Sequence, residues 1–126
     1  MREDGILVVE DDGLIALHLT ETLEKAGYRV IGPVFSGEAV LQEFKKSPLP
    51  DLILMDVGLA GSLDGIETAV QIRKRFPVPI IFITAYSTER MLERMKDTCH
   101  NGIIQKPFAV ADLLNLIKKT LGSKTA

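Results

Sequence analysis

The amino-acid sequence predicts an α/β fold, a doubly wound parallel sheet of five strands flanked by five helices. Short apolar runs recur five times along the chain, and a segment of helical length follows each of them. Most of these runs are continuously apolar rather than alternating, which indicates strands covered on both faces by helices. Strand and helix therefore alternate, and right-handed crossovers between the strands are expected.

The predicted strands are the apolar runs at residues 6–9, 28–31, 52–55 and 80–83 and a weaker run at 103–104. On the first helix, the expected apolar stripe consists of Ile15, Leu19, Thr22, Leu23 and Ala26. Gly27 is expected to end that helix. Further helices are expected at 38–46, 66–76 and 88–98, because Gly or Pro residues bound these segments.

The last helix has the clearest helical pattern in the chain. Its apolar residues recur at the spacing of one helix face, and they are Val110, Leu113, Leu114, Ile117 and Leu121. Gly122 is expected to end this helix, and residues 123–126 are expected to form a polar tail. The core should therefore span about residues 5–122.

Length and composition are those of a single domain covering residues 1–126, because so short a chain leaves little room for two stable cores. The net charge of -2 does not favour nucleic acid or an anionic membrane as a partner. The chain begins without the features of a secretory signal and has no apolar run near the roughly 20 residues of a membrane span. With the lone Cys99, interpreted as a small apolar residue near a helix end, these features indicate a soluble cytoplasmic protein.

Reactive or ionisable residues stand where four of the five predicted strands end. They are Glu10, Asp11 and Asp12 after the first strand, Asp56 after the third, Thr84 after the fourth and Lys106 after the fifth. Doubly wound sheets bind ligands at this edge. Carboxylates that converge there repel one another unless a cation holds them together. Oxygen ligands favour Mg²⁺, and a cluster without His or Cys argues against zinc.

Asp56 is the candidate nucleophile, because it directly follows the apolar run of the predicted central strand. A carboxylate can accept a phosphoryl group as an acyl phosphate, and such transfer depends mainly on positioning and on neutralising charge. Lys106 can supply positive charge, and the Thr84 hydroxyl can donate a hydrogen bond to a phosphoryl oxygen. Asp12 directly precedes Gly13 and the start of a helix, so we interpret it as a helix cap and not as part of the site.

Taken together, these motifs resemble those of the receiver domains of two-component response regulators. They are LVVEDD at 7–12, LILMD at 52–56, DG at 64–65, TA at 84–85 and KPF at 106–108, in the order of that family and at nearly its spacing. The resemblance covers residues 6–121. It implies a flavodoxin-like fold with the strand order 2-1-3-4-5 and a cis peptide bond before Pro107.

The resemblance also implies the ligands and the reaction. The implied ligands of Mg²⁺, for which Mn²⁺ could substitute, are Glu10, Asp11, Asp56 and the backbone carbonyl of Gly58. Asp56 would accept a phosphoryl group from the phosphohistidine of a sensor histidine kinase or phosphotransfer domain, and Thr84 and Lys106 would contact that group. The chain would then catalyse only its own phosphorylation and dephosphorylation.

Phosphorylation would, by the same resemblance, switch a protein-interaction surface made by the fourth helix, the fifth strand and the fifth helix. That surface would contact a downstream protein, a fused output domain or a second copy of the chain, without direct contact to nucleic acid or membrane. Leu14 and Leu17 point away from the apolar stripe of the first helix, which can dock a kinase in this family. Ile103 stands where the family often has an aromatic residue that moves with Thr84. Gly58 and Tyr86 stand at positions that, in this family, influence how fast water removes the phosphate.

Two other classes of protein share parts of this pattern. An aspartyl-phosphate phosphatase usually needs a second Asp two residues after the nucleophile, and this chain has Gly58 there. A flavodoxin would want a loop rich in Ser, Thr and Gly after the first strand, whereas Glu10, Asp11 and Asp12 would repel the phosphate of FMN. The regulated phosphoacceptor is therefore the leading hypothesis.

Overall fold

The computed structural model describes residues 4–46, 49–59, 61, 63–85, 88–98 and 100–125, so the interpretations of Tyr86 and Cys99 lie outside the described residues. Strands and helices alternate along the chain, as predicted. The elements are β1 (Gly5–Val9), α1 (Gly13–Lys25), β2 (Arg29–Val34), α2 (Gly37–Lys46), β3 (Leu52–Asp56), α3 (Gly65–Arg73), β4 (Ile80–Thr84), α4 (Glu89–Lys96), β5 (Gly102–Gln105) and α5 (Val110–Thr125).

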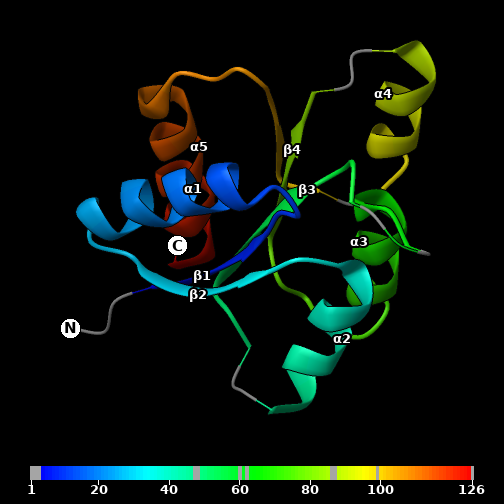
Figure 1. Ribbon diagram of the computed structural model, residues 1–126, viewed down its shortest axis with the longest axis horizontal. Coiled ribbons are helices and arrows are strands. Elements are labelled where there is room, and N and C mark those ends of the chain that lie inside the picture. The colour runs from blue at the N-terminus through cyan, green and yellow to red at the C-terminus, as the bar shows by residue number, and fades with distance from the viewer. Residues whose placement is uncertain are drawn as a thin grey trace.

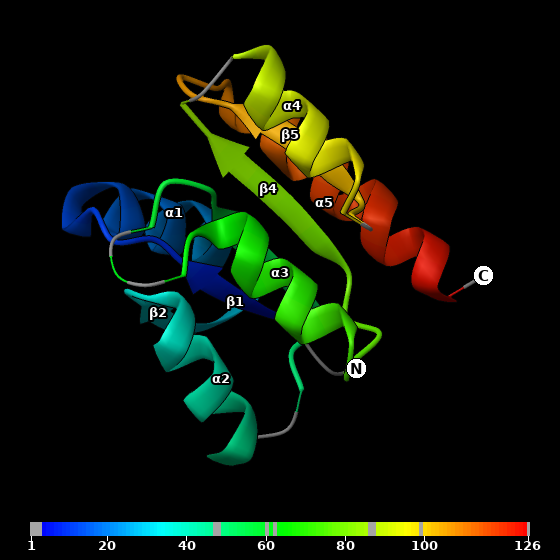
Figure 2. The same cartoon turned by 90° about the vertical axis from the view of Figure 1, so that its right-hand side faces the viewer.

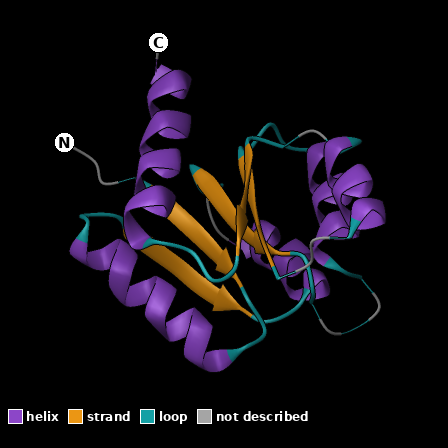
Figure 3. Cartoon of the chain, turned by 90° about the horizontal axis from the view of Figure 1, so that it is seen from above, coloured by secondary structure: helices purple, strands orange, loops and turns teal. Residues whose placement is uncertain are grey.

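The strands form one parallel sheet in the order β2-β1-β3-β4-β5, which confirms the predicted fold (Figure 3). In the centre of the sheet, Leu7 pairs with Ile53 and Ile53 pairs with Ile80. This register brings the ends of β1, β3 and β4 to one edge of the sheet. The residues that follow these strands therefore lie close together although they are far apart in sequence.

Two layers of helices cover the sheet, with α1 and α5 on one face and α2, α3 and α4 on the other (Figures 1 and 2). The side chains of each central strand alternate between the two layers. Ile6 belongs to the same hydrophobic cluster as Leu19 of α1 and Ile117 of α5, whereas its neighbour Leu7 belongs to the cluster that contains Ile72 of α3. Because both faces are covered, the strands are continuously apolar in sequence, as the prediction required.

Helix caps explain where α1 begins and ends. The Asp12 carboxylate accepts hydrogen bonds from the N–H groups of Leu14 and Ile15 at 3.0 and 3.2 Å, so its interpretation as a cap is confirmed. Gly27 follows the helix with a φ of 95°, a left-handed conformation that suits glycine.

Several predicted boundaries are wrong. The strand β2 continues past residue 31 to Val34 through a cis Gly32–Pro33 peptide and a shift in register. An edge strand tolerates Pro, because only one side of it pairs with a neighbour. Helix α3 ends at Arg73 rather than at residue 76, and α4 spans 89–96 because Thr88 and Asp97 are its caps.

The predicted features of α5 and of the α1 stripe also need correction. Helix α5 continues through Gly122 to Thr125, so this glycine does not end it. A single glycine costs a helix only about 1 kcal/mol, which the neighbouring turns can offset. In α1 the buried residues are Ala16, Leu19 and Leu23, while Ala26 is an exposed C-cap.

Candidate functional site

Three carboxylates meet at the carboxyl edge of the sheet. Carboxylate oxygens of Glu10, Asp11 and Asp56 all lie within 4.8 Å of one another. Asp56 is the last residue of β3, and Glu10 directly follows β1, the neighbouring strand. Glu10 and Asp56 are buried, with 1% and 5% of their surface exposed, and Asp11 is exposed. The site is therefore a partly buried acidic pocket in which one of the three acids, Asp11, is exposed.

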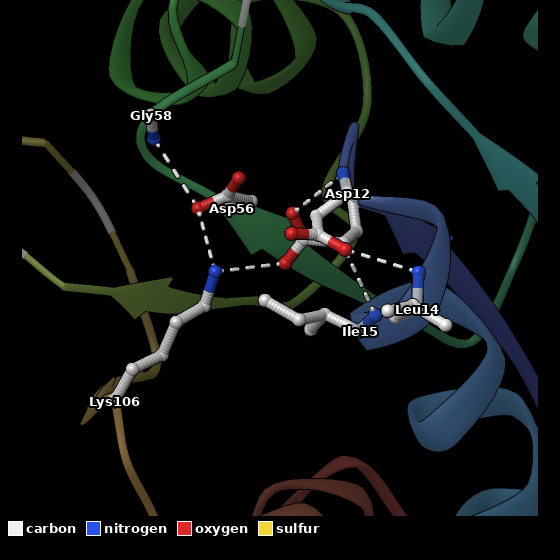
Figure 4. A network of polar contacts seen from close by, with 7 residues as sticks. Asp12, Leu14, Ile15, Asp56, Gly58 and Lys106 are labelled. Atoms are coloured by element: carbon white, nitrogen blue, oxygen red, sulfur yellow. Dashed lines mark hydrogen bonds and ion pairs between the residues drawn. The ribbon is translucent and has the colours of Figure 1, made fainter.

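Lys106 links two of these carboxylates. Its Nζ lies 2.9 Å from Oε1 of Glu10 and 3.4 Å from Oδ1 of Asp56, and Figure 4 shows the lysine reaching Asp56. The backbone N–H of Lys106 donates to the carbonyl of Thr84 at 2.7 Å, which fixes the lysine beside the end of β4. The peptide bond between Lys106 and Pro107 is cis, as expected.

Thr84 and Gly58 lie at the same edge. Thr84 is buried at the end of β4, the strand beside β3, and the preceding Ile83 pairs with Asp56 in the sheet. Gly58 is exposed in the loop after β3, and its N–H donates to Oδ1 of Asp56 at 3.3 Å (Figure 4). The fold thus brings together all six residues that the sequence analysis singled out as site residues, Glu10, Asp11, Asp56, Gly58, Thr84 and Lys106.

Burial and neighbouring charges shift the pKa values of Glu10 and Lys106. Burial, reinforced by a hydrogen bond and repulsion from Asp56, raises the pKa of Glu10 from 4.5 to about 7, although Lys106 opposes the shift. Burial alone would lower the pKa of Lys106. Its hydrogen bond to Glu10 and the charges of Asp56 and Glu10 outweigh that effect, so the pKa is raised and the side chain stays protonated.

The chemistry of the donor set fits a hard divalent cation. The three carboxylates supply the oxygen ligands that Mg²⁺ prefers, and their oxygens lie within 4.8 Å of one another. The raised pKa of Glu10 shows that one Lys106 does not fully compensate two buried acids. A second positive charge would relieve this repulsion.

One ion pair beside the site was missing from the sequence analysis. Arg94 of α4 contacts Oδ2 of Asp64 at 2.8 Å, and Asp64 is also the N-cap of α3. The two residues line one side of a groove of about 530 Å³, together with Val57, Gly58, Leu59, Thr88, Arg90 and Met91. No motif in the sequence points to this pair, because 30 positions separate its members.

A second groove of about 530 Å³ borders Lys106 on the other side of the site. It is mostly apolar, and its lining residues are Leu14, Ile15, His18, Ala85, Lys106, Pro107 and Phe108. Leu14 is 81% exposed and Leu17 of the same helix is 54% exposed, which confirms that both point away from the core. Among the described residues, no helix has the length and apolar character needed to cross a bilayer.

The sheet order and the acidic pocket define a class, the flavodoxin-like α/β domains that carry a carboxylate cluster and a lysine at the carboxyl edge of the sheet. A family model described as the response regulator receiver domain matches residues 6–118. The chain therefore belongs to the response regulator receiver domain family, a family of signalling domains.

Two curated relatives are regulatory proteins, as their names state. The transcriptional regulatory protein PdtaR of Mycobacterium tuberculosis is 34% identical over 113 residues, which cover 90% of this chain and 54% of that protein. The phyllosphere-induced regulator PhyR of Methylorubrum extorquens is 37% identical over 118 residues, which cover 92% of this chain and 43% of that protein. This chain thus spans about half the length of these relatives.

A solved structure matches over nearly the whole chain. It is the receiver domain of the sensor histidine kinase PA1611 from Pseudomonas aeruginosa, described with a magnesium ion coordinated in its active site cleft. The two chains are 30% identical, the TM-score is 0.85, and the match covers 96% of this chain and 99% of the other.

Proposed function

We propose that this receiver domain accepts a phosphoryl group on Asp56 and thereby switches a protein-interaction surface. The observation that carries the proposal is the meeting of Glu10, Asp11 and Asp56 with the Lys106 ammonium at the end of the central strand. The support from relatives is membership of the receiver family and the magnesium described in the PA1611 domain.

In the proposed reaction, a carboxylate oxygen of Asp56 attacks the phosphorus of a phosphohistidine in line. The new O–P bond forms as the P–N bond breaks, and the electron pair of that bond leaves with the imidazole, which then takes up a proton from water. The rigid end of β3 holds the attacking oxygen in position. Lys106 already lies 3.4 Å from Asp56 and can move onto a phosphoryl oxygen, and the Thr84 hydroxyl can donate to another.

The residues proposed to hold Mg²⁺, or Mn²⁺ in its place, are Glu10, Asp11, Asp56 and the backbone carbonyl of Gly58. When bound, the cation neutralises charge on the phosphoryl oxygens and on the carboxylates that surround them. We further propose that the domain performs no turnover on other substrates, since Gly58 stands where a phosphatase would carry its acid.

For the donor, we propose a sensor histidine kinase or a phosphotransfer domain in the cytoplasm. The apolar groove beside Lys106 gives such a partner a surface to dock on, with the exposed Leu14 at its rim. The output surface would be α4, β5 and α5, which would contact a downstream protein, a fused domain or a second copy of the chain. No direct contact with nucleic acid or membrane is proposed.

Incubation with radiolabelled acetyl phosphate, with and without Mg²⁺, tests the proposal. The wild-type protein should acquire alkali-labile phosphate, as expected of an acyl phosphate, only when Mg²⁺ is present, and Asp56→Asn should acquire none. Asp12→Asn is the matched control, because Asn caps a helix as well as Asp does and the substitution keeps the backbone N–H that residue 12 donates to Glu10. Labelling of Asp56→Asn at the wild-type level would refute the assignment.

A further inference from the structure

Gly65, the first residue of α3, lies directly against the backbone at the end of β3. Its N–H donates to the carbonyl of Val57 at 3.0 Å. A Cβ atom at this position would meet the carbonyl oxygen of Asp56 and would lie 2.8 Å from both the carbonyl carbon of Asp56 and Cα of Val57. These are backbone atoms, which cannot turn aside as a flexible side chain can. Position 65 therefore accepts a side chain only if the end of β3 or the start of α3 moves.

The start of α3 is ordered by its own helix cap and is tied to α4 by one ion pair. Asp64 and Glu67 form a capping box, in which the Asp64 carboxylate accepts from the Glu67 N–H at 2.8 Å and the Glu67 carboxylate accepts from the Asp64 N–H at 3.0 Å. The other carboxylate oxygen of Asp64 binds Arg94 of α4 at 2.8 Å. Added bulk at Gly65 would therefore push the start of α3 and the end of β3 apart and strain both.

The end of β3 carries the reactive group. Asp56 is the last residue of the strand, and its Oδ1 accepts the N–H of Gly58 at 3.3 Å. Val57 lies between these two residues, and Gly65 lies against Val57 and against the carbonyl group of Asp56. A displacement of Val57 would therefore shift the Asp56 carboxylate and the Gly58 carbonyl relative to Glu10 and Lys106.

We infer that the first turn of α3, through its contact at Gly65, is a positioning element for phosphoryl transfer. Gly65 touches neither the cation nor the phosphoryl group. Its missing side chain lets α3 approach the strand closely enough to fix the Asp56 carboxylate and the loop that carries Gly58. This inference rests on the proposed function.

The test compares three glycine substitutions by Mg²⁺ calorimetry, by the rate of labelling with acetyl phosphate and by urea unfolding. Gly65→Ala should weaken Mg²⁺ binding and slow labelling by roughly 10- to 100-fold, as expected for misplaced ligands and a misplaced nucleophile. Gly13→Ala is a control beside the site, since nothing lies within 4 Å of its added methyl group. Gly102→Ala is a control for steric crowding elsewhere in the fold. Gly102 lies on β5, and its added Cβ would lie 2.7 Å from the side chain of Leu116. Both controls should stay within about twofold of wild type in Mg²⁺ affinity and labelling rate.

A further variant, Arg94→Met, loosens the start of α3 without adding bulk near Asp56. This variant should weaken Mg²⁺ binding by less than tenfold. It becomes the test of the positioning role if Gly65→Ala does not fold. The inference is overturned if folded Gly65→Ala binds Mg²⁺ and takes up phosphate like wild type. It is also overturned if Gly102→Ala loses as much Mg²⁺ affinity and labelling rate as Gly65→Ala does. It is also overturned if Gly65→Ala is unfolded and Arg94→Met matches wild type. If the wild-type protein itself takes up no phosphate, the proposed function fails instead.

Discussion

Two buried carboxylates lie at opposite ends of the sheet in different surroundings. At the amino end, Asp51 is 6% exposed and forms hydrogen bonds with the backbone N–H and the backbone carbonyl of Gly5. Its Oδ2 accepts the N–H of Gly5 at 2.7 Å, and its own N–H donates to the Gly5 carbonyl at 2.8 Å. At the carboxyl end, Glu10 is buried even more completely, but its neighbours include two other carboxylates.

This difference distinguishes an acid with a structural role, Asp51, from an acid of the proposed site, Glu10. A buried acid that accepts backbone N–H groups stabilises the fold and needs no further partner. An acid buried among other acids is stable in its charged form only when a cation joins the group. Burial alone therefore does not single out a candidate site residue, whereas the clustering of Glu10 with two other acids does.

The largest expected contrast concerns metal binding. The double substitution Glu10→Gln and Asp11→Asn removes two of the three clustered charges and should weaken Mg²⁺ binding at least about 100-fold. Asp51→Asn, at the other end of the sheet, should leave the affinity unchanged. Calorimetric titration at pH 8 measures both. Equal affinities in the double variant and the wild type would show that the cluster does not hold the cation.

The pH dependence of stability should also differ between the two ends. Glu10 has a pKa of about 7 in the folded protein and an ordinary value of 4.5 when unfolded. Its contribution to stability without Mg²⁺ is fully present below about pH 4.5 and is lost as the pH rises through about 7, by roughly 1.4 kcal/mol per pH unit at most. Urea unfolding of the metal-free protein should show this decline, and Glu10→Gln or excess Mg²⁺ should flatten it. If the free energy of unfolding of Glu10→Gln falls as steeply with pH, the pH dependence arises from a group other than Glu10.

A smaller effect is expected at the amino end. Asp51→Ala leaves the buried N–H of Gly5 without its acceptor, which should lower the free energy of unfolding by roughly 1–3 kcal/mol. Under conditions where the variant is folded, its labelling by acetyl phosphate should match that of wild type. A loss of labelling in folded Asp51→Ala would contradict the structural role given to this residue.

Most of the fold could be predicted because its signals are local. Continuously apolar runs identify strands covered on both faces, and the helical spacing of Val110 to Leu121 identifies α5. The end of β2 was missed because Gly32–Pro33 has the composition of a turn, and only its place at the sheet edge permits the strand to continue. Gly122 was wrongly predicted to end α5. Glycine often follows the last turn of a helix, but here the helix continues through it to Thr125.

The site could be predicted as far as strand ends determine it. Glu10, Asp56, Thr84 and Lys106 follow or end strands, and parallel strands bring such residues to one edge. The ion pair between Arg94 and Asp64 depends on how α4 lies against α3, which no spacing in the sequence encodes. The contact of Gly65 with β3 is likewise visible only as a distance between backbone atoms.

The most direct test of the central claim is a crystal structure of the protein with Mg²⁺ and beryllofluoride, which stands in for the phosphoryl group. The account predicts that beryllium is bonded to a carboxylate oxygen of Asp56, with Mg²⁺ ligated by Glu10, Asp11 and Asp56 and with Lys106 on a fluorine. Mg²⁺ bound away from Glu10 and Asp11, or beryllofluoride on a different carboxylate, would contradict it.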